Sequence, residues 1–131
     1  MGGAFDALDI ANSSLGMHQT WLDALADNIA NANTITSTDE SAFQAQMVIA
    51  QAKPEGGVEV RGIAYSDPEG RTEYQPDNPL ADADGNVRTP DMDMSSQMSQ
   101  LVMAQRGYQA SVQVTKYATD SYSSALTIGE R

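Results

Sequence analysis

The chain has 131 residues, a formal net charge of −11 and no cysteine. The length fits one domain, and the charge argues against nucleic acid or an anionic membrane surface as a partner, because both require a basic patch. The missing thiols exclude disulfides and thiolate metal sites. No apolar run is long enough to insert into a membrane, and the N-terminus lacks the basic segment of a cleaved secretory signal.

The first predicted element is a long helix, from about residue 5 to about residue 32. Its apolar residues step by three and four, which is the pattern of a coiled-coil seam. At a rise of 1.5 Å, about 28 residues give a rod of roughly 40 Å, which suits a bundle better than a compact domain. The seam consists of Leu8, Ala11, Leu15, His18, Leu22, Leu25, Ile29 and Ala32.

The end of this helix carries three asparagines, Asn28, Asn31 and Asn33. Asparagine is a poor helix former, so the three cost helix stability unless their amides have partners. The amides either bond a facing chain and fix its register, or the helix end is exposed and Asn33 is a left-handed cap. We expect Asn28 and Asn31 to find partners on another helix in the assembled protein, and Asn33 to mark the point where the helix stops.

Residues 34–90 have a different character and contain all five prolines. Residues 43–50 are ambiguous but compatible with a strand. Residues 58–61 alternate apolar and polar side chains, as a half-exposed strand does, and residues 71–75 form a second short strand. Large apolar residues are too few for a separate core. We therefore expect a small β-hairpin and loops, ordered against their neighbours.

Helical periodicity returns from about residue 92 to about residue 128. Pro90, with Asp91 or Asp93, suits the start of a helix, and Gly129 suits its end. The predicted seam is soft, because glutamine and threonine replace leucine and because methionine adapts to different neighbours. It consists of Met94, Met98, Leu101, Gln105, Tyr108, Val112, Thr115, Thr119, Tyr122 and Leu126.

The predicted fold is mainly α, with two long terminal helices in a coiled coil or bundle and an irregular middle segment. The expected divisions are residues 1–33, 34–90 and 91–131, which act as one assembly unit. Two paired helices still leave apolar surface on both members. That surface must meet other copies of the chain or other proteins.

No group of residues indicates catalysis. The single histidine, His18, lies on the apolar seam and has no second histidine or cysteine as a partner. Residues 82–86 resemble part of a calcium loop, but an EF-hand would place Leu80 at the first ligand position. There is no glycine-rich phosphate loop. We therefore expect no enzymatic activity, no cofactor and no metal.

Two of the chain's motifs resemble those of bacterial flagellar rod and hook proteins. Residues 22–34, LDALADNIANANT, resemble the N-terminal pattern ANNLANxNT, with Asp27 where the family commonly has Asn. Residues 106–111, RGYQAS, resemble the C-terminal pattern RxYQAN, with Ser111 in place of the final Asn. Both patterns are shared by many axial proteins of the flagellum.

A third motif is more specific. Residues 78–93, NPLADADGNVRTPDMD, resemble the segment NPxADADGYVxxPNVD of the proximal rod subunit, with Asn86 for Tyr and Asp91 for Asn. The order and spacing of the three motifs match across nearly the whole chain. The chain is thus similar to the flagellar basal-body rod protein family.

The resemblance implies a structural subunit of the proximal rod, located in the basal body within the cell envelope. Such subunits assemble with copies of themselves and other rod subunits into a helical tube that transmits torque and encloses the export channel. They leave by the flagellar type III route without a cleaved signal, so the rod-base adaptor and the export apparatus are further expected partners. The terminal helices form the inner coiled-coil layer, and the middle segment reaches outward or along the rod.

An alternative from another class is a helical adaptor or chaperone-type interaction module that uses the same two helices. In either case the candidate residues for the bundle and for subunit contacts lie on the two helices. They are Leu15, Leu22, Leu25, Asn28, Ile29, Asn31, Leu101, Arg106, Tyr108, Gln109, Val112 and Leu126.

Overall fold

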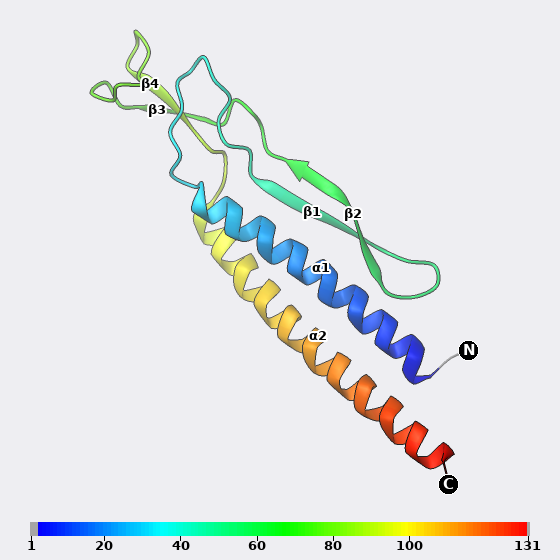
Figure 1. The fold of residues 1–131 in the computed structure, drawn as a ribbon. Coiled ribbons are helices and arrows are strands. Elements are labelled where there is room, and N and C mark those ends of the chain that lie inside the picture. The colour runs from blue at the N-terminus through cyan, green and yellow to red at the C-terminus, as the bar shows by residue number, and fades with distance from the viewer. Residues whose placement is uncertain (1–2, 131) are drawn as a thin grey trace.

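The computed structural model describes residues 3–130, and the predicted mainly α fold with two long terminal helices is confirmed. The helices run antiparallel, side by side, so that the start of α1 and the end of α2 lie at the same end of the helix pair (Figure 1). Met1 and Gly2, part of the segment on which the secretory-signal expectation rests, lie outside the described residues. None of the described helices has the length and apolar character needed to cross a membrane. The elements are α1 (Ala4–Ala30), β1 (Gln46–Ala52), β2 (Val58–Tyr65), β3 (Arg71–Tyr74), β4 (Asn86–Thr89) and α2 (Met94–Gly129).

The middle segment forms two antiparallel ladders where one hairpin was expected. β1 pairs with β2, with a register shift between Ile49 and Ala50. β3 pairs with β4, and an isolated bridge joins Thr36 to Arg88 on the other side of β4. The expected segments 43–50, 58–61 and 71–75 overlap β1, β2 and β3, whereas residues 43–45 and 75 lie outside these strands and β4 is not among the predicted elements.

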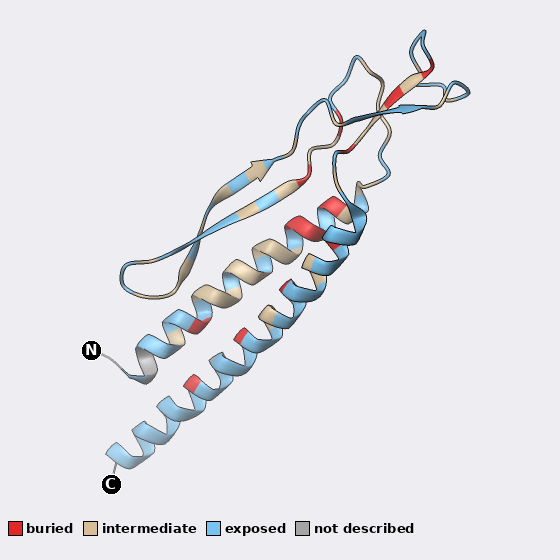
Figure 2. Cartoon of the chain, turned by 180° about the vertical axis from the view of Figure 1, so that it is seen from behind, coloured by how far each residue is buried: buried red, intermediate tan, exposed pale blue. Residues whose placement is uncertain are grey.

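Helix α1 lies at the centre of the folded chain. It contacts α2 on one side and the β1–β2 hairpin on the other, as Figure 1 shows. Its buried residues, in red in Figure 2, are Ala11, Ala24, Leu25 and Asn28. The remaining members of the predicted α1 seam are all half-buried, so the seam is confirmed.

Helix α2 faces α1 with a different row of residues from the one that its apolar pattern predicts. The buried positions recur every seven residues, at Gln97, Ala104, Ser111 and Ala118. Of the predicted seam, Leu101, Tyr108 and Thr115 are half-buried beside this row, and the other members are exposed. Ser14 and Asn28 of α1 form hydrogen bonds with Ser111 and Gln97 of this row. The bulkier methionines and valines of α2 are exposed. The predicted seam of α2 is therefore right at three of its ten positions and wrong at the seven that are exposed. The exposed members are Met94, Met98, Gln105, Val112, Thr119, Tyr122 and Leu126.

The helix ends match the prediction at α2 but not at α1. The carboxylate of Asp93 accepts a hydrogen bond from the backbone N–H of Ser96 at 3.1 Å, which is the expected N-cap. Helix α1 ends at Ala30 with Asn31 as its C-cap at φ −107°, and no described residue other than glycine has a positive φ. The left-handed cap at Asn33 is therefore wrong. The Asn31 amide instead donates to the carbonyl of Asp27 at 2.9 Å and so satisfies a terminal acceptor of the helix.

The loop before β4 is held together by one carboxylate. Asp82 Oδ1 accepts from the backbone N–H groups of Asp84 and Asn86, both at 2.9 Å, and Oδ2 accepts from Thr38 Oγ1 at 3.0 Å. Within residues 3–130 there is no group of three or more side chains suited to a metal ion. Asp82 thus acts as an internal turn-forming acceptor.

This geometry predicts a pH-dependent turn. The hydrogen bond from the Asn86 N–H lowers the pKa of Asp82, since it favours the charged carboxylate. Stabilisation of the turn by this group is present above the unfolded pKa of about 3.9 and is lost as the pH falls through the lower folded value. An NMR titration of the Asn86 amide should show a transition centred below about 3.9. The transition should be absent in Asp82→Asn; one centred above that value would contradict the assignment.

Candidate subunit interface

The junction of α1, α2 and the β1–β2 hairpin is organised by Asn28, whose side chain is 0% exposed. Asn28 Nδ2 donates to the Gln46 carbonyl oxygen at 2.9 Å and to Gln97 Oε1 at 3.0 Å. In return, the Gln46 N–H donates to Asn28 Oδ1 at 2.8 Å. One amide thereby fixes the register of α1 against both α2 and β1, and Asn28 has the partner on another helix that its position predicts.

Asn31 does not share this arrangement. Its amide donates to Asp27 in the same helix, to the backbone carbonyl and to the side-chain Oδ1. These bonds need no second element. A partner for Asn31 on another helix therefore stays a prediction about the assembled protein.

Farther along the pair, α1 and α2 touch where His18 lies against Gly107. A Cβ placed on Gly107 would overlap the His18 imidazole, so any larger residue at this point of α2 requires that ring to move. His18 Nδ1 lies 2.8 Å from the Ser14 carbonyl oxygen, which can only accept, so the proton is on Nδ1. Ser111 Oγ donates to the Gly107 carbonyl, and Ser14 Oγ therefore donates to Ser111 Oγ at 2.8 Å. His18 is a packing residue, as its position on the seam indicates.

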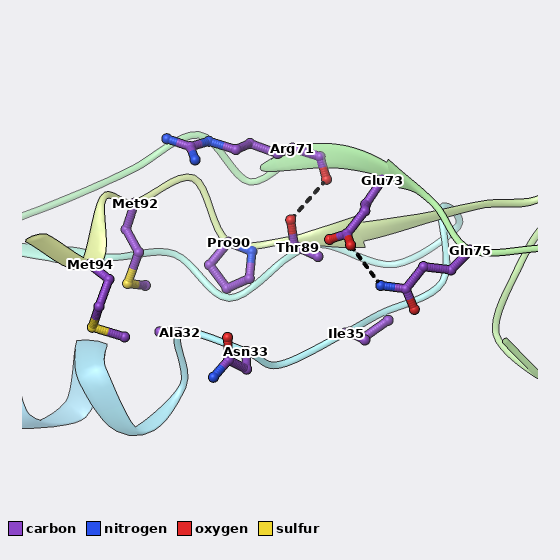
Figure 3. Close-up of a pocket in the computed structure, with 10 residues that line it drawn as sticks. All are labelled: Ala32, Asn33, Ile35, Arg71, Glu73, Gln75, Thr89, Pro90, Met92 and Met94. Carbon is purple, nitrogen blue, oxygen red and sulfur yellow. Dashed lines mark hydrogen bonds between the residues drawn. The ribbon is translucent and has the colours of Figure 1, made fainter.

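A hollow of ≈ 310 Å³ lies at the joint between the helix pair and the β3–β4 ladder. Figure 3 shows the hydrogen bonds from Thr89 Oγ1 to the Arg71 carbonyl and from Gln75 Nε2 to Glu73 Oε1. The Arg71 guanidinium pairs with Asp91 at 2.9 Å. Because these polar groups satisfy one another, the hollow offers structural contacts and no arrangement of reactive groups. Its lining is Ala32, Asn33, Ile35, Arg71, Glu73, Gln75, Thr89, Pro90, Met92 and Met94.

The candidate interface residues divide into two sets. One set is buried or half-buried: Leu25 and Asn28 are buried, Leu15, Leu22, Ile29, Leu101 and Tyr108 are half-buried on the two helices, and Asn31 is half-buried at the end of α1. The other set is exposed on α2 and consists of Arg106, Gln109, Val112 and Leu126. Contacts of either set with a second subunit stay a prediction.

Sequence reasoning missed the residues of α2 that contact α1 most closely. Gln97 and Gly107 were not among the candidates, nor were the small residues Ala104, Ser111 and Ala118. Their only signal in the sequence is the spacing of seven between Gln97, Ala104, Ser111 and Ala118, which a search for large apolar residues passes over.

Most of the exposed large apolar side chains of the described residues lie on α2. Val112 is 42% exposed, Leu126 54% and Ile128 73%. Every residue from 121 to 130 is exposed, and α2 extends beyond the start of α1 (Figure 1). Exposed apolar surface is typical of regions that contact another protein.

Curated relatives align with nearly the whole of this two-helix chain. The flagellar basal-body rod protein FlgC of Salmonella typhimurium is 34% identical over 127 residues, which cover 93% of this chain and 95% of the relative. FlgC of Yersinia enterocolitica is 36% identical with the same coverage. The chain belongs to the FlgC family. FlgC of Bacillus subtilis is 27% identical over 148 residues, which cover 97% of this chain and 99% of the relative.

No family model matches the chain. Membership of the FlgC family, whose members are named basal-body rod proteins, nevertheless confirms the predicted role as a structural subunit of the rod. The alternative, a helical adaptor or chaperone, has no support among these relatives.

Proposed function

We propose that this chain assembles with copies of itself and other rod subunits into a helical tube, which transmits torque and encloses the export channel. The observation that supports this is the set of apolar side chains of α2 that α1 leaves exposed, among them Val112 and Leu126. A contact between two different surfaces, repeated with rotation and rise, generates a tube or filament.

The proposal extends to how the subunit reaches and joins the rod. The chain would be exported by the flagellar type III route without a cleaved signal and would meet the export apparatus and the rod-base adaptor at the cell envelope. The helices of residues 1–33 and 91–131 would form the inner layer. Residues 34–90 would reach neighbouring subunits, which the projection of β3–β4 beyond the helix pair supports (Figure 1). The role is structural, and no residue is assigned to catalysis.

Deletion of the gene followed by electron microscopy of isolated basal bodies tests the function. We expect basal bodies without a complete rod, and non-motile cells that recover when the wild-type gene is supplied on a plasmid. Complete rods and hooks in the deletion strain would rule out the proposal.

The exposed end of α2 gives a prediction that separates assembly from folding. Leu126→Gln with Ile128→Gln should change the free energy of unfolding by less than about 0.5 kcal/mol, since both side chains are exposed. The same variant should fail to support swimming, because it removes apolar contacts that form only in the assembly. Urea unfolding and soft-agar motility measure the two effects, and normal swimming would count against a role for this end.

A further inference from the structure

One glycine of α1 has no explanation within the described chain. Gly16 lies in the helix interior, where glycine destabilises a helix relative to alanine. A Cβ at Gly16 would meet no atom within 4 Å, whereas one at Gly107 would overlap His18. Gly107 is thus required by the packing of the helix pair, and Gly16 is not.

Gly16 belongs to an exposed row on α1 with Asp9 and Asp23, spaced by seven residues. Each member precedes a residue of the α1 seam by two positions. Two positions correspond to about 200° around a helix, so the row points away from α2. It lies beside, and not under, the β1–β2 hairpin, which meets α1 at Met17 and Trp21. Neither carboxylate forms an ion pair within residues 3–130. The row is therefore an exposed strip with one glycine between two aspartates, of which Asp9 also lines a hollow together with Lys53.

Helix α2 carries the complementary charges. Between residues 94 and 119 it has two basic residues, Arg106 and Lys116, and no acidic one. Both are exposed, and neither pairs with a described carboxylate. Arg106 follows the buried Ala104 by two positions and so points away from the helix pair, whereas Lys116, ten residues later, lies about 80° from it around the helix, on the side of α2. Between them in the sequence lies Val112, which is exposed.

We propose that the side of α2 that carries Arg106, Val112 and Lys116, which spans about 120° around the helix, docks on the Asp9–Gly16–Asp23 row of a second copy of the chain. Arg106 and Lys116 face the two aspartates, and Val112 enters the open space above Gly16. The aspartates are about 21 Å apart along their helix and the bases about 15 Å, a difference that long basic side chains span. The two surfaces differ, so the contact can repeat from copy to copy without closing. The inference rests on the proposed role in the rod.

Cross-linking tests the contact directly. The chain has no cysteine, so in Gly16→Cys/Val112→Cys the introduced thiols are the only pair available. Gly16 points away from α2 and a Cβ there meets no atom within 4 Å, so the two positions cannot meet within one copy. In basal bodies from cells with this variant as the sole copy, oxidation should produce a ladder of multimers. Tyr74→Cys/Val112→Cys, with Tyr74 exposed at the far end, is the matched control and should produce none.

Motile cells whose basal bodies yield no ladder from the Gly16→Cys/Val112→Cys protein would overturn the docking surface. They would leave the proposed rod function intact, because that function is tested separately by the deletion strain. A ladder that appears equally in the Tyr74→Cys control would also overturn the inference, since it would show collision without specific contact.

Charge exchange provides a second test. Asp9→Arg/Asp23→Arg and Arg106→Glu/Lys116→Glu should each reduce swimming at least tenfold, because like charges then face one another. A chain with all four substitutions should recover swimming. Co-expression of the two double variants should recover it as well, because alternating copies again pair opposite charges. If neither combination recovers swimming while circular dichroism shows folded helices, the partner of this surface is not a second copy and the inference fails.

Discussion

Replacing Asn28 by leucine is expected to lower the free energy of unfolding by about 3 kcal/mol, although leucine is the better helix former. The substitution leaves the Gln46 N–H, the Gln46 carbonyl and Gln97 Oε1 without their hydrogen-bond partner. A buried polar group without a partner costs about 1–3 kcal/mol. The loss exceeds the gain in apolar burial, because the site is lined by these polar groups.

Urea unfolding followed by circular dichroism measures the effect. Asn12→Leu is the matched control, since Asn12 is an exposed asparagine of the same helix and its replacement should cost less than about 0.5 kcal/mol. Asn28→Asp should also destabilise, because a carboxylate can accept from the Gln46 N–H but cannot donate to Gln97. Equal stability of Asn28→Leu and the wild type would show that the three bonds do not hold the junction together.

Gly107→Ala is expected to destabilise the protein by about 1–3 kcal/mol, because the added methyl group overlaps the His18 imidazole and forces the helices apart. Helix propensity acts in the opposite direction, since alanine stabilises a helix interior by about 1 kcal/mol relative to glycine. The net loss of unfolding free energy therefore reports how tightly α1 and α2 pack where His18 meets Gly107.

Two further variants isolate that cause. Gly16→Ala makes the same chemical change in open space and should stabilise the monomer by about 0.5–1 kcal/mol. In the double variant His18→Ala/Gly107→Ala the overlap is gone, so the two changes together should cost less than the sum of the single changes. Thermal unfolding of the wild type, His18→Ala, Gly107→Ala and the double variant gives the comparison, and additive effects would contradict the overlap.

The sequence predicted α1 better than α2, for a physical reason. Leucines at positions such as Leu15 and Leu22 carry a strong periodic signal, and the start of α2 follows from the capping carboxylate of Asp93. The contact row of α2 consists of Gln97 and small residues, which have no hydrophobic signal. The valines and methionines of α2 have that signal but remain exposed, because no element of the chain covers them.

The register role of Asn28 was predictable, but only in part. Three asparagines in six residues indicate unusual partners, and Asn28 has one in Gln97. The backbone of Gln46 as a second partner was not predictable, because it depends on β1 lying along α1. Strand β4 was missed for the same reason: its pairing with β3 spans an irregular loop that has no strand pattern of its own.

The hydrogen bonds that join α1 to α2 connect residues far apart in the chain. Asn28 and Gln97 are 69 positions apart, and Ser14 and Ser111 are 97 apart. Contacts of such long range require closure of a large loop before they contribute stability, and proteins dominated by them fold slowly. During synthesis the helices also cannot pair until the ribosome has passed Met94, where α2 begins. We therefore expect the newly synthesised polypeptide to remain open for longer than its small size alone would suggest.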